Sequence, residues 1–142
     1  MAETVRIRLG PWDELRALAA PIRFTVFVEE QKVPAEIELD AQDPVSLHAI
    51  AFDAAQAPVA TGRLLPDGHI GRMAVLPQAR GSGVGTAVLL ALMQAAREGG
   101  HREVVLSAQT HAVAFYARQG FATEGEVYDD AGIPHIDMRR AL

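Results

Sequence analysis

The stretch "ARGSGVGTAV", residues 79–88, holds three glycines within five positions. Apolar residues up to Leu76 precede it, and a helix-like apolar run that begins at Ala87 follows it. Glycines between a strand and a helix let backbone N–H groups turn toward an anion at the helix N-terminus. The stretch therefore predicts a strand, an anion-binding loop and a helix in succession.

Three loop chemistries use glycines in such a position. The phosphate loop of nucleotide-binding proteins needs a lysine directly after its last glycine, whereas Thr86 follows Gly85 here. The dinucleotide fingerprint G-x-G-x-x-G is met by Gly81 and Gly83 but not at its third position. The stretch does satisfy R-x-x-G-x-G, beginning at Arg80. The loop alone also leaves open a simple glycine turn that packs a strand tightly against a helix.

The composition is that of a soluble globular protein, with 142 residues, 49% hydrophobic and 22% charged. We expect one domain that spans residues 1–142. The absence of cysteine excludes disulfides, thiolate metal sites and cysteine nucleophiles. A net charge of −5 with scattered basic residues argues against nucleic acid as a partner. No apolar run is long enough for a signal peptide or a membrane span, so we expect a cytoplasmic protein without membrane contact.

Local patterns predict an α+β domain, that is, an α/β arrangement with a mixed sheet. Helical spacing covers Trp12 to Glu30, and Pro21 marks either a break or a new first turn. Thr110 is expected to cap a short helix that ends at Gly120. A further helix runs from the glycine loop to Glu98, apolar on nearly every face and therefore expected to be buried. Strands are expected at residues 5–9, 46–53, 59–65, 69–75, 103–108, 121–127 and 135–141, the second to fourth forming an antiparallel meander, with an acidic loop at 29–44.

These segments together resemble the GNAT superfamily of N-acetyltransferases, in which R-x-x-G-x-G binds the pyrophosphate of acetyl-CoA. Residues 71–93 match the family's fourth strand, phosphate loop and third helix, and residues 104–121 match its fifth strand and fourth helix. Residues 23–43 and 131–138 resemble the ElaA-like subgroup more narrowly. The resemblance implies a GNAT-like fold: a mostly antiparallel central sheet, splayed fourth and fifth strands, and about four helices.

The resemblance also implies acetyl-CoA as the co-substrate and no metal. Its pantetheine arm would lie between the splayed strands, bonded by the backbone of Met73 and Val75. Gln109 stands where the family often has an asparagine that contacts this arm. The pyrophosphate would be held by the loop residues, which are Arg80, Gly81, Ser82, Gly83, Val84, Gly85 and Thr86.

The implied reaction is direct attack of a neutral amine on the thioester, which yields an amide and free CoA. It needs a base for the amine, polarisation of the carbonyl and a proton for the leaving thiolate. Tyr116 matches the family's general acid, with a partly buried aromatic as the alternative interpretation. Glu30 is our first choice of base because it is the glutamate of the subgroup motif V-F-V-x-E-Q.

The acceptor side is predicted from acidic and histidine residues. The carboxylates around Asp43 would attract a cationic amine, or they form only a solvated acidic loop. Each histidine has a structural or surface role as its alternative, and none shows the spacing of a zinc site. The candidate substrate-binding residues are Glu38, Asp40, His48, His111 and His135.

The sequence therefore predicts an N-acetyltransferase acting on a small-molecule or peptide primary amine. The alternative is a non-catalytic module that binds or senses acyl-CoA. Exposed edge strands would also allow a homodimer.

Overall fold

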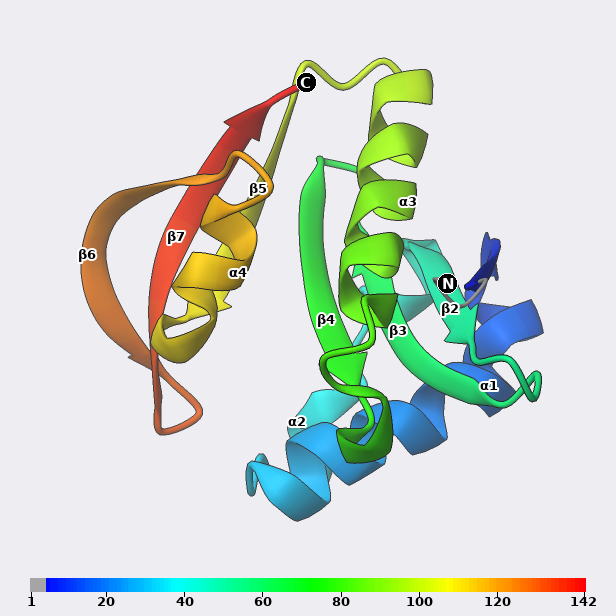
Figure 1. Ribbon diagram of the computed structural model, residues 1–142. Coiled ribbons are helices and arrows are strands. Elements are labelled where there is room, and N and C mark those ends of the chain that lie inside the picture. Colours follow the sequence, from blue (N-terminus) through cyan, green and yellow to red (C-terminus); the bar gives the residue numbers. More distant parts are fainter. Residues whose placement is uncertain (1–4) are drawn as a thin grey trace.

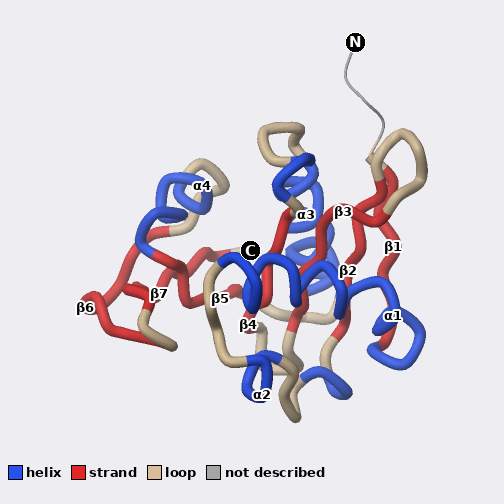
Figure 2. Tube along the Cα trace, turned by 90° about the horizontal axis from the view of Figure 1, so that it is seen from below, coloured by secondary structure: helices blue, strands red, loops and turns tan. Residues whose placement is uncertain are grey.

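The computed structural model describes residues 5–142 and consists of one seven-stranded sheet with helices on both faces (Figures 1 and 2). The strand order is β1-β2-β3-β4-β5-β7-β6. Figure 2 shows α1 and α2 on one side of the sheet and α3 and α4 on the other. The elements are β1 (Arg6–Pro11), α1 (Trp12–Arg23), the π-helix η1 (Phe24–Glu30), α2 (Ala35–Glu38), the 3₁₀ turn η2 (Asp43–Val45), β2 (Leu47–Phe52), β3 (Pro58–Leu64), β4 (His69–Val75), η3 (Pro77–Ala79), α3 (Val84–Glu98), β5 (Glu103–Gln109), η4 (Thr110–Ala112), α4 (Val113–Ala117), β6 (Ala122–Asp130) and β7 (Ile133–Ala141).

One strand pair is parallel, and it is short. Strands β2 to β4 form the predicted antiparallel meander, β1 extends it antiparallel to β2, and β5, β7 and β6 are also antiparallel. Between β4 and β5 only His69 pairs with Val105 and Ile70 with Leu106, after which the strands separate (Figure 1). This confirms the mixed α+β fold with splayed fourth and fifth strands.

Helix α3 packs closely on β2, β3 and β4. Its Val88, Leu89 and Leu92 are fully buried. An added Cβ on Gly62 of β3 would lie 2.6 Å from the Met73 sulfur and 3.0 Å from Leu92 Cδ1, so this position has no room for a side chain. The helix is less buried than its composition predicts, since Leu90 is 47% exposed. In the described part of the chain, no helix is long and apolar enough to span a membrane.

Pro21 does not break the first helix, contrary to the sequence-based expectation. Helix α1 continues through it to Arg23 and then widens into η1. The missing proline N–H and the ring disturb the α-helical bonds around Pro21, and the Phe24 N–H just beyond reaches both Ala20 and Pro21 carbonyls. Such π turns often occur at functional sites. Here η1 carries Phe27 and Glu30 to a cleft described below.

The stretch 29–44 is not simply a solvated acidic loop, because arginines pair with its carboxylates at Glu30, Glu38, Asp40 and Asp43. Buried Arg23 bonds Glu38 through Nε at 2.7 Å and Asp43 through Nη1 at 2.7 Å. Arg63 bonds Asp43 and Asp40, at 2.9 and 2.7 Å. We call these residues, together with Arg72 described below, the ion-pair cluster.

His48 lies beneath this cluster rather than in an acceptor site. Its Nε2 donates to the Asp43 carbonyl at 2.9 Å, and its ring packs 4.7 Å from that of Trp12. Only 1% of the residue is exposed, and this burial lowers the pKa of His48 and keeps the imidazole neutral. The predicted substrate contact of His48 is therefore replaced by a structural role.

The last third of the chain differs from the prediction in its boundaries. Helix α4 ends at Ala117 rather than Gly120, and the Thr110 side chain does not cap it. Strands β6 and β7 are longer than expected, because a tight turn at Ala131 and Gly132 joins them directly. Both turn residues have positive φ, 54° and 80°, as hairpin turns of two residues require.

We predict that Asp43→Asn lowers the free energy of unfolding by about 3 kcal/mol, because it removes the buried counter-charge that Arg23 and Arg63 share. Burial opposes ionisation of Asp43, but the hydrogen bonds and charge of Arg23, together with hydrogen bonds from Arg63 and the Asp40 backbone, outweigh it and hold the pKa of this carboxyl below its usual value. The carboxylate therefore stabilises the fold above the ordinary aspartate pKa and loses this effect as the pH falls through the lowered one. Urea denaturation of the wild type and of Asp43→Asn from pH 7 to pH 3 measures the difference between their free energies of unfolding. This difference should become smaller as the pH falls. Exposed Glu36→Gln is the control, and equal stability losses for the two variants would contradict the prediction.

Candidate active site

A cleft of about 670 Å³ opens where β4 and β5 separate. Its walls come from η1, β4, β5, α4 and the turn between β6 and β7. The predicted site residues that line it are Glu30, Glu38, Met73, Val75, Arg80, Gly85, Gln109, His111, Tyr116 and His135. The predicted site residues that do not line it are Asp40, His48, Gly81, Ser82, Gly83, Val84 and Thr86.

The glycine loop leads into α3 at the edge of this cleft. Gly81 and Gly83 have φ of 80° and 87°, and an added Cβ on either would meet open space. The N–H groups of Gly81 and of residues 83–86 donate to no acceptor within residues 5–142. Ser82 is the exception, because both its N–H and its hydroxyl bond the Ala79 carbonyl. Free N–H groups and the positive end of a 15-residue helix together favour an anion.

Arg80 and Glu30 form a bidentate ion pair across the mouth of the cleft. The Nη1 and Nη2 atoms of Arg80 bond the two carboxylate oxygens at 2.8 and 2.6 Å, and Nε donates to the Val75 carbonyl at 3.1 Å. The hydrogen bonds from Arg80 lower the pKa of Glu30. The pair thus joins the predicted base to the predicted phosphate ligand, 50 positions apart.

A pair of glutamines also bridges the cleft. Gln109 Nε2 donates to Gln31 Oε1 at 2.8 Å, and Gln31 Nε2 donates back at 3.3 Å. Gln31 follows η1, and Gln109 ends β5, so the pair joins the two sides. The amide of Gln109 therefore has a protein partner at the position predicted to meet pantetheine.

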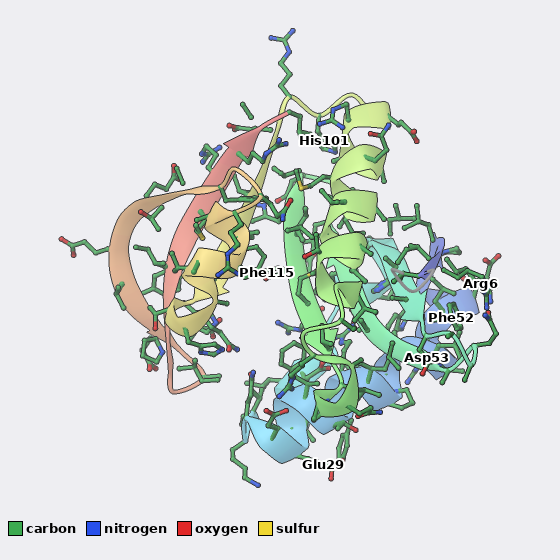
Figure 3. All side chains as sticks on the ribbon, viewed as in Figure 1. Arg6, Glu29, Phe52, Asp53, His101 and Phe115 are labelled. Atoms are coloured by element: carbon green, nitrogen blue, oxygen red, sulfur yellow. The ribbon has the colours of Figure 1, made fainter. Side chains whose placement is uncertain are left out.

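Tyr116 brings a protonated phenol to the cleft wall formed by α4. Its ring makes edge contacts with Phe115 and Phe121, at centroid distances of 5.1 and 5.9 Å. Figure 3 shows Phe115 pointing from α4 toward β4 and α3. Burial raises the pKa of Tyr116 to about 12, so the hydroxyl keeps its proton at neutral pH. This hydroxyl forms no hydrogen bond to any residue from Val5 onward.

His135 is held in one tautomer. Its Nδ1 lies 2.7 Å from the Ile133 carbonyl and must donate to it, because a carbonyl only accepts. In the neutral ring the lone pair is then on Nε2. The ring stacks on Tyr128 with a centroid distance of 6.1 Å, and His135 pairs with Gln109 in the β5–β7 ladder. The exposed His111 lines the cleft near the end of β5.

Several cleft residues were missed by sequence reasoning. Arg63 and Arg72 line the cleft beside Glu38, and both bond Asp40. Arginine within otherwise apolar strands was the available signal for these two. Gln31 follows Glu30 in the quoted motif, but nothing local indicates its partner. Within residues 5–142, no three histidine or acidic side chains gather into a group that could hold a metal.

Comparisons with known proteins agree with this geometry. The family described as "Acetyltransferase (GNAT) domain" matches residues 18–142. The uncharacterised N-acetyltransferase YjcF of Bacillus subtilis is 42% identical over 123 residues, covering 84% of this chain and 87% of YjcF. Among solved structures, an acyl-CoA N-acyltransferase from Pseudomonas aeruginosa is 37% identical, with a TM-score of 0.83 and 97% and 100% of the two chains covered. Escherichia coli ElaA is 29% identical, with a TM-score of 0.83 and coverage of 96% and 99%.

Proposed function

Because the chain belongs to the GNAT family and is an acyl-CoA-dependent acetyltransferase, we propose that it transfers the acetyl group of acetyl-CoA directly to a primary amine. One observation carries the proposal. The glycine loop, whose N–H groups at Gly81 and residues 83–86 bond no acceptor in the described part of the chain, reaches through Arg80 and Gly85 the same cleft that Tyr116 lines. An anion site and a proton donor in one cleft are what a CoA thioester needs.

The loop residues are suited to bind the pyrophosphate of the co-substrate. The free N–H groups of Gly81 and residues 83–86 surround the start of α3, and Arg80 lies beside them. Arg80 bonds a carboxylate in this structure through one N–H of each Nη atom, and the second N–H of each Nη atom can donate to a phosphate while Glu30 stays bound. An added Cβ on Gly85 would lie 3.2 Å from Val75 Cγ2 and 3.6 Å from Phe115 Cζ, which would narrow the passage beside β4.

Tyr116 is proposed to give its proton to the leaving thiolate. A hydroxyl with a pKa of about 12 is fully protonated at neutral pH and is free to donate toward sulfur. Backbone groups of Met73 and Val75 lie on the part of β4 that has no pairing with β5, where they can bond the pantetheine arm. The bound thioester supplies the acyl group, and the protein positions it and supplies the proton.

Two groups are candidates for the base that deprotonates the amine. His135 can offer a lone pair at Nε2, because its Nδ1 donates to the Ile133 carbonyl. Glu30 has both oxygens on Arg80 and a lowered pKa, so it accepts a proton poorly unless Arg80 leaves it. We therefore propose His135 as the base and assign Glu30 to holding Arg80.

Tyr116→Phe is expected to lower kcat by about 100-fold or more, in line with loss of a general acid, with the Kd for acetyl-CoA within about threefold. Thiol release from acetyl-CoA and mass detection of the acetylated amine, over a panel of primary amines, measure the rate. The other tyrosine provides a matched control, because Tyr128→Phe removes a hydroxyl outside the cleft and keeps the ring that stacks on His135. A Tyr116→Phe rate within a few-fold of wild type in folded protein would remove Tyr116 from the mechanism.

His135→Gln and Glu30→Gln separate the two bases through the pH dependence of kcat/KM. A histidine base makes the wild-type rate rise with pH until the imidazole is neutral, and His135→Gln should abolish this rise and lower the plateau by about 100-fold. Glu30→Gln should keep the rise. The opposite assignment, with the rise lost only in Glu30→Gln, would identify Glu30 as the base.

A further inference from the structure

The cleft side of the ion-pair cluster contains an arginine that lacks its own carboxylate. Arg23 bonds Glu38 and Asp43, and Arg63 bonds Asp40 and Asp43. Arg72 has one carboxylate contact, from Nη2 to Asp40 Oδ2 at 3.2 Å. Arg63 Nη2 also uses this oxygen, at 3.0 Å. The other Arg72 bonds go to backbone carbonyls of Ile37 and Glu38, which carry no charge.

Arg72 presents its free edge to the cleft. The guanidinium Nη1 donates to no acceptor within residues 5–142. The side chain is 30% exposed and belongs to the cleft lining. Burial, followed by repulsion from Arg63, lowers the pKa of Arg72, because together they outweigh the attraction of Asp40. Arginine remains protonated in proteins, so the charge at this end of the cleft persists.

The backbone is distorted where Arg72 stands. Its φ is +48°, a left-handed conformation that is uncommon for a residue with a side chain. The β3–β4 pairing shifts register here, next to Arg63. A bulge of this kind re-aims a side chain, and here the Arg72 head reaches the α2 side of the sheet, whereas Met73 packs toward α3. A conformation this unfavourable at a cleft residue points to a role in binding.

A second unsatisfied donor lies beside it. Arg63 is 6% exposed and lines the cleft, and its Nε has no hydrogen-bond partner within residues 5–142. A buried donor without an acceptor destabilises a protein by about 1–3 kcal/mol, so such groups normally bond another protein group, an ordered water or a ligand. None of the acids that line the cleft, which are Glu30, Glu38 and Asp130, bonds this Nε; Glu30 bonds Arg80 and Glu38 bonds Arg23.

From these contacts we infer that the acceptor is a primary amine that also carries a carboxylate, with the carboxylate bound by Arg72. The inference rests on the proposed acyl transfer and names its substrate class. The amine end would face the Tyr116 and His135 part of the cleft, while the anionic end lies between β4 and α2. This differs from the sequence-based expectation of an acidic acceptor site, because arginines take the carboxylates of Glu38 and Asp40.

Pairs of substrates that differ only in the carboxylate measure how much this group contributes to recognition of the acceptor. The ω-amino acids 4-aminobutanoate, 5-aminopentanoate and 6-aminohexanoate are compared with their primary amides by thiol release. Wild-type kcat/KM should favour at least one acid over its amide by about tenfold or more, as expected for a charge-assisted hydrogen bond. Arg72→Gln should bring this ratio close to one with little change for the amide. Arg97→Gln, an equal change of charge on the exposed side of α3, should keep the wild-type ratio.

Binding of product analogues tests the inference independently of catalysis. Calorimetry with 4-acetamidobutanoate and 4-acetamidobutanamide, in the presence of CoA, should show the same preference for the acid and its loss in Arg72→Gln. Absence of thiol release with every amine would contradict the proposed acyl transfer, whereas the binding ratio would still decide the anion site. Equal rates and equal binding of acid and amide in the wild type, or an unchanged ratio in Arg72→Gln, would overturn the inference. Arg72→Met, which also removes the charge and keeps a long side chain, serves the same comparison if Arg72→Gln does not fold.

Discussion

The parallel pairing of β4 with β5 ends after two residue pairs, which leaves the second half of β4 without a strand partner on that side. Backbone groups in a sheet interior normally bond another strand, and groups left unpaired remain available to a ligand. The cleft, the glycine loop and α4 are all arranged around this opening. The packing of α3 on β2–β4 keeps one side in place, while β5, β7 and β6 form the other.

The ion-pair cluster supports the acceptor side of the opening. Buried arginine–carboxylate pairs add little net stability, because desolvation offsets much of their attraction. Their geometry is nevertheless specific, since Arg23 at the end of α1 holds Glu38 of α2 and Asp43 of η2 together. The same cluster leaves Arg72 with an incomplete set of partners at the cleft surface. Arg72 is a fixed positive charge that is only partly compensated. It gives this wall of the cleft a preference for anionic groups, which an apolar wall would lack.

Glycine spacing and strand periodicity were sufficient to predict the loop, the meander and the helix that follows. These features depend on neighbouring residues, and the loop between β4 and α3 follows directly from R-x-x-G-x-G. The continuation of α1 through Pro21 was not predictable from local sequence. A helix can tolerate the loss of one backbone hydrogen bond at a proline when a wider π turn follows it. The partners of the acidic residues were not predictable either. Arg23 and Asp43 are 20 positions apart, and Arg80 and Glu30 are 50 apart, so only the assembled fold brings them together.

Binding of acetyl-CoA tests the central claim most directly. Calorimetric titration of the folded protein with acetyl-CoA, with NAD and ATP as controls, measures whether the opening between β4 and β5 takes this co-substrate. We expect one site per chain with a Kd in the micromolar range, corresponding to about −8 kcal/mol, and no comparable binding of NAD or ATP. Failure of the folded protein to bind acetyl-CoA would contradict the account and leave residues 79–88 as a turn that packs β4 against α3.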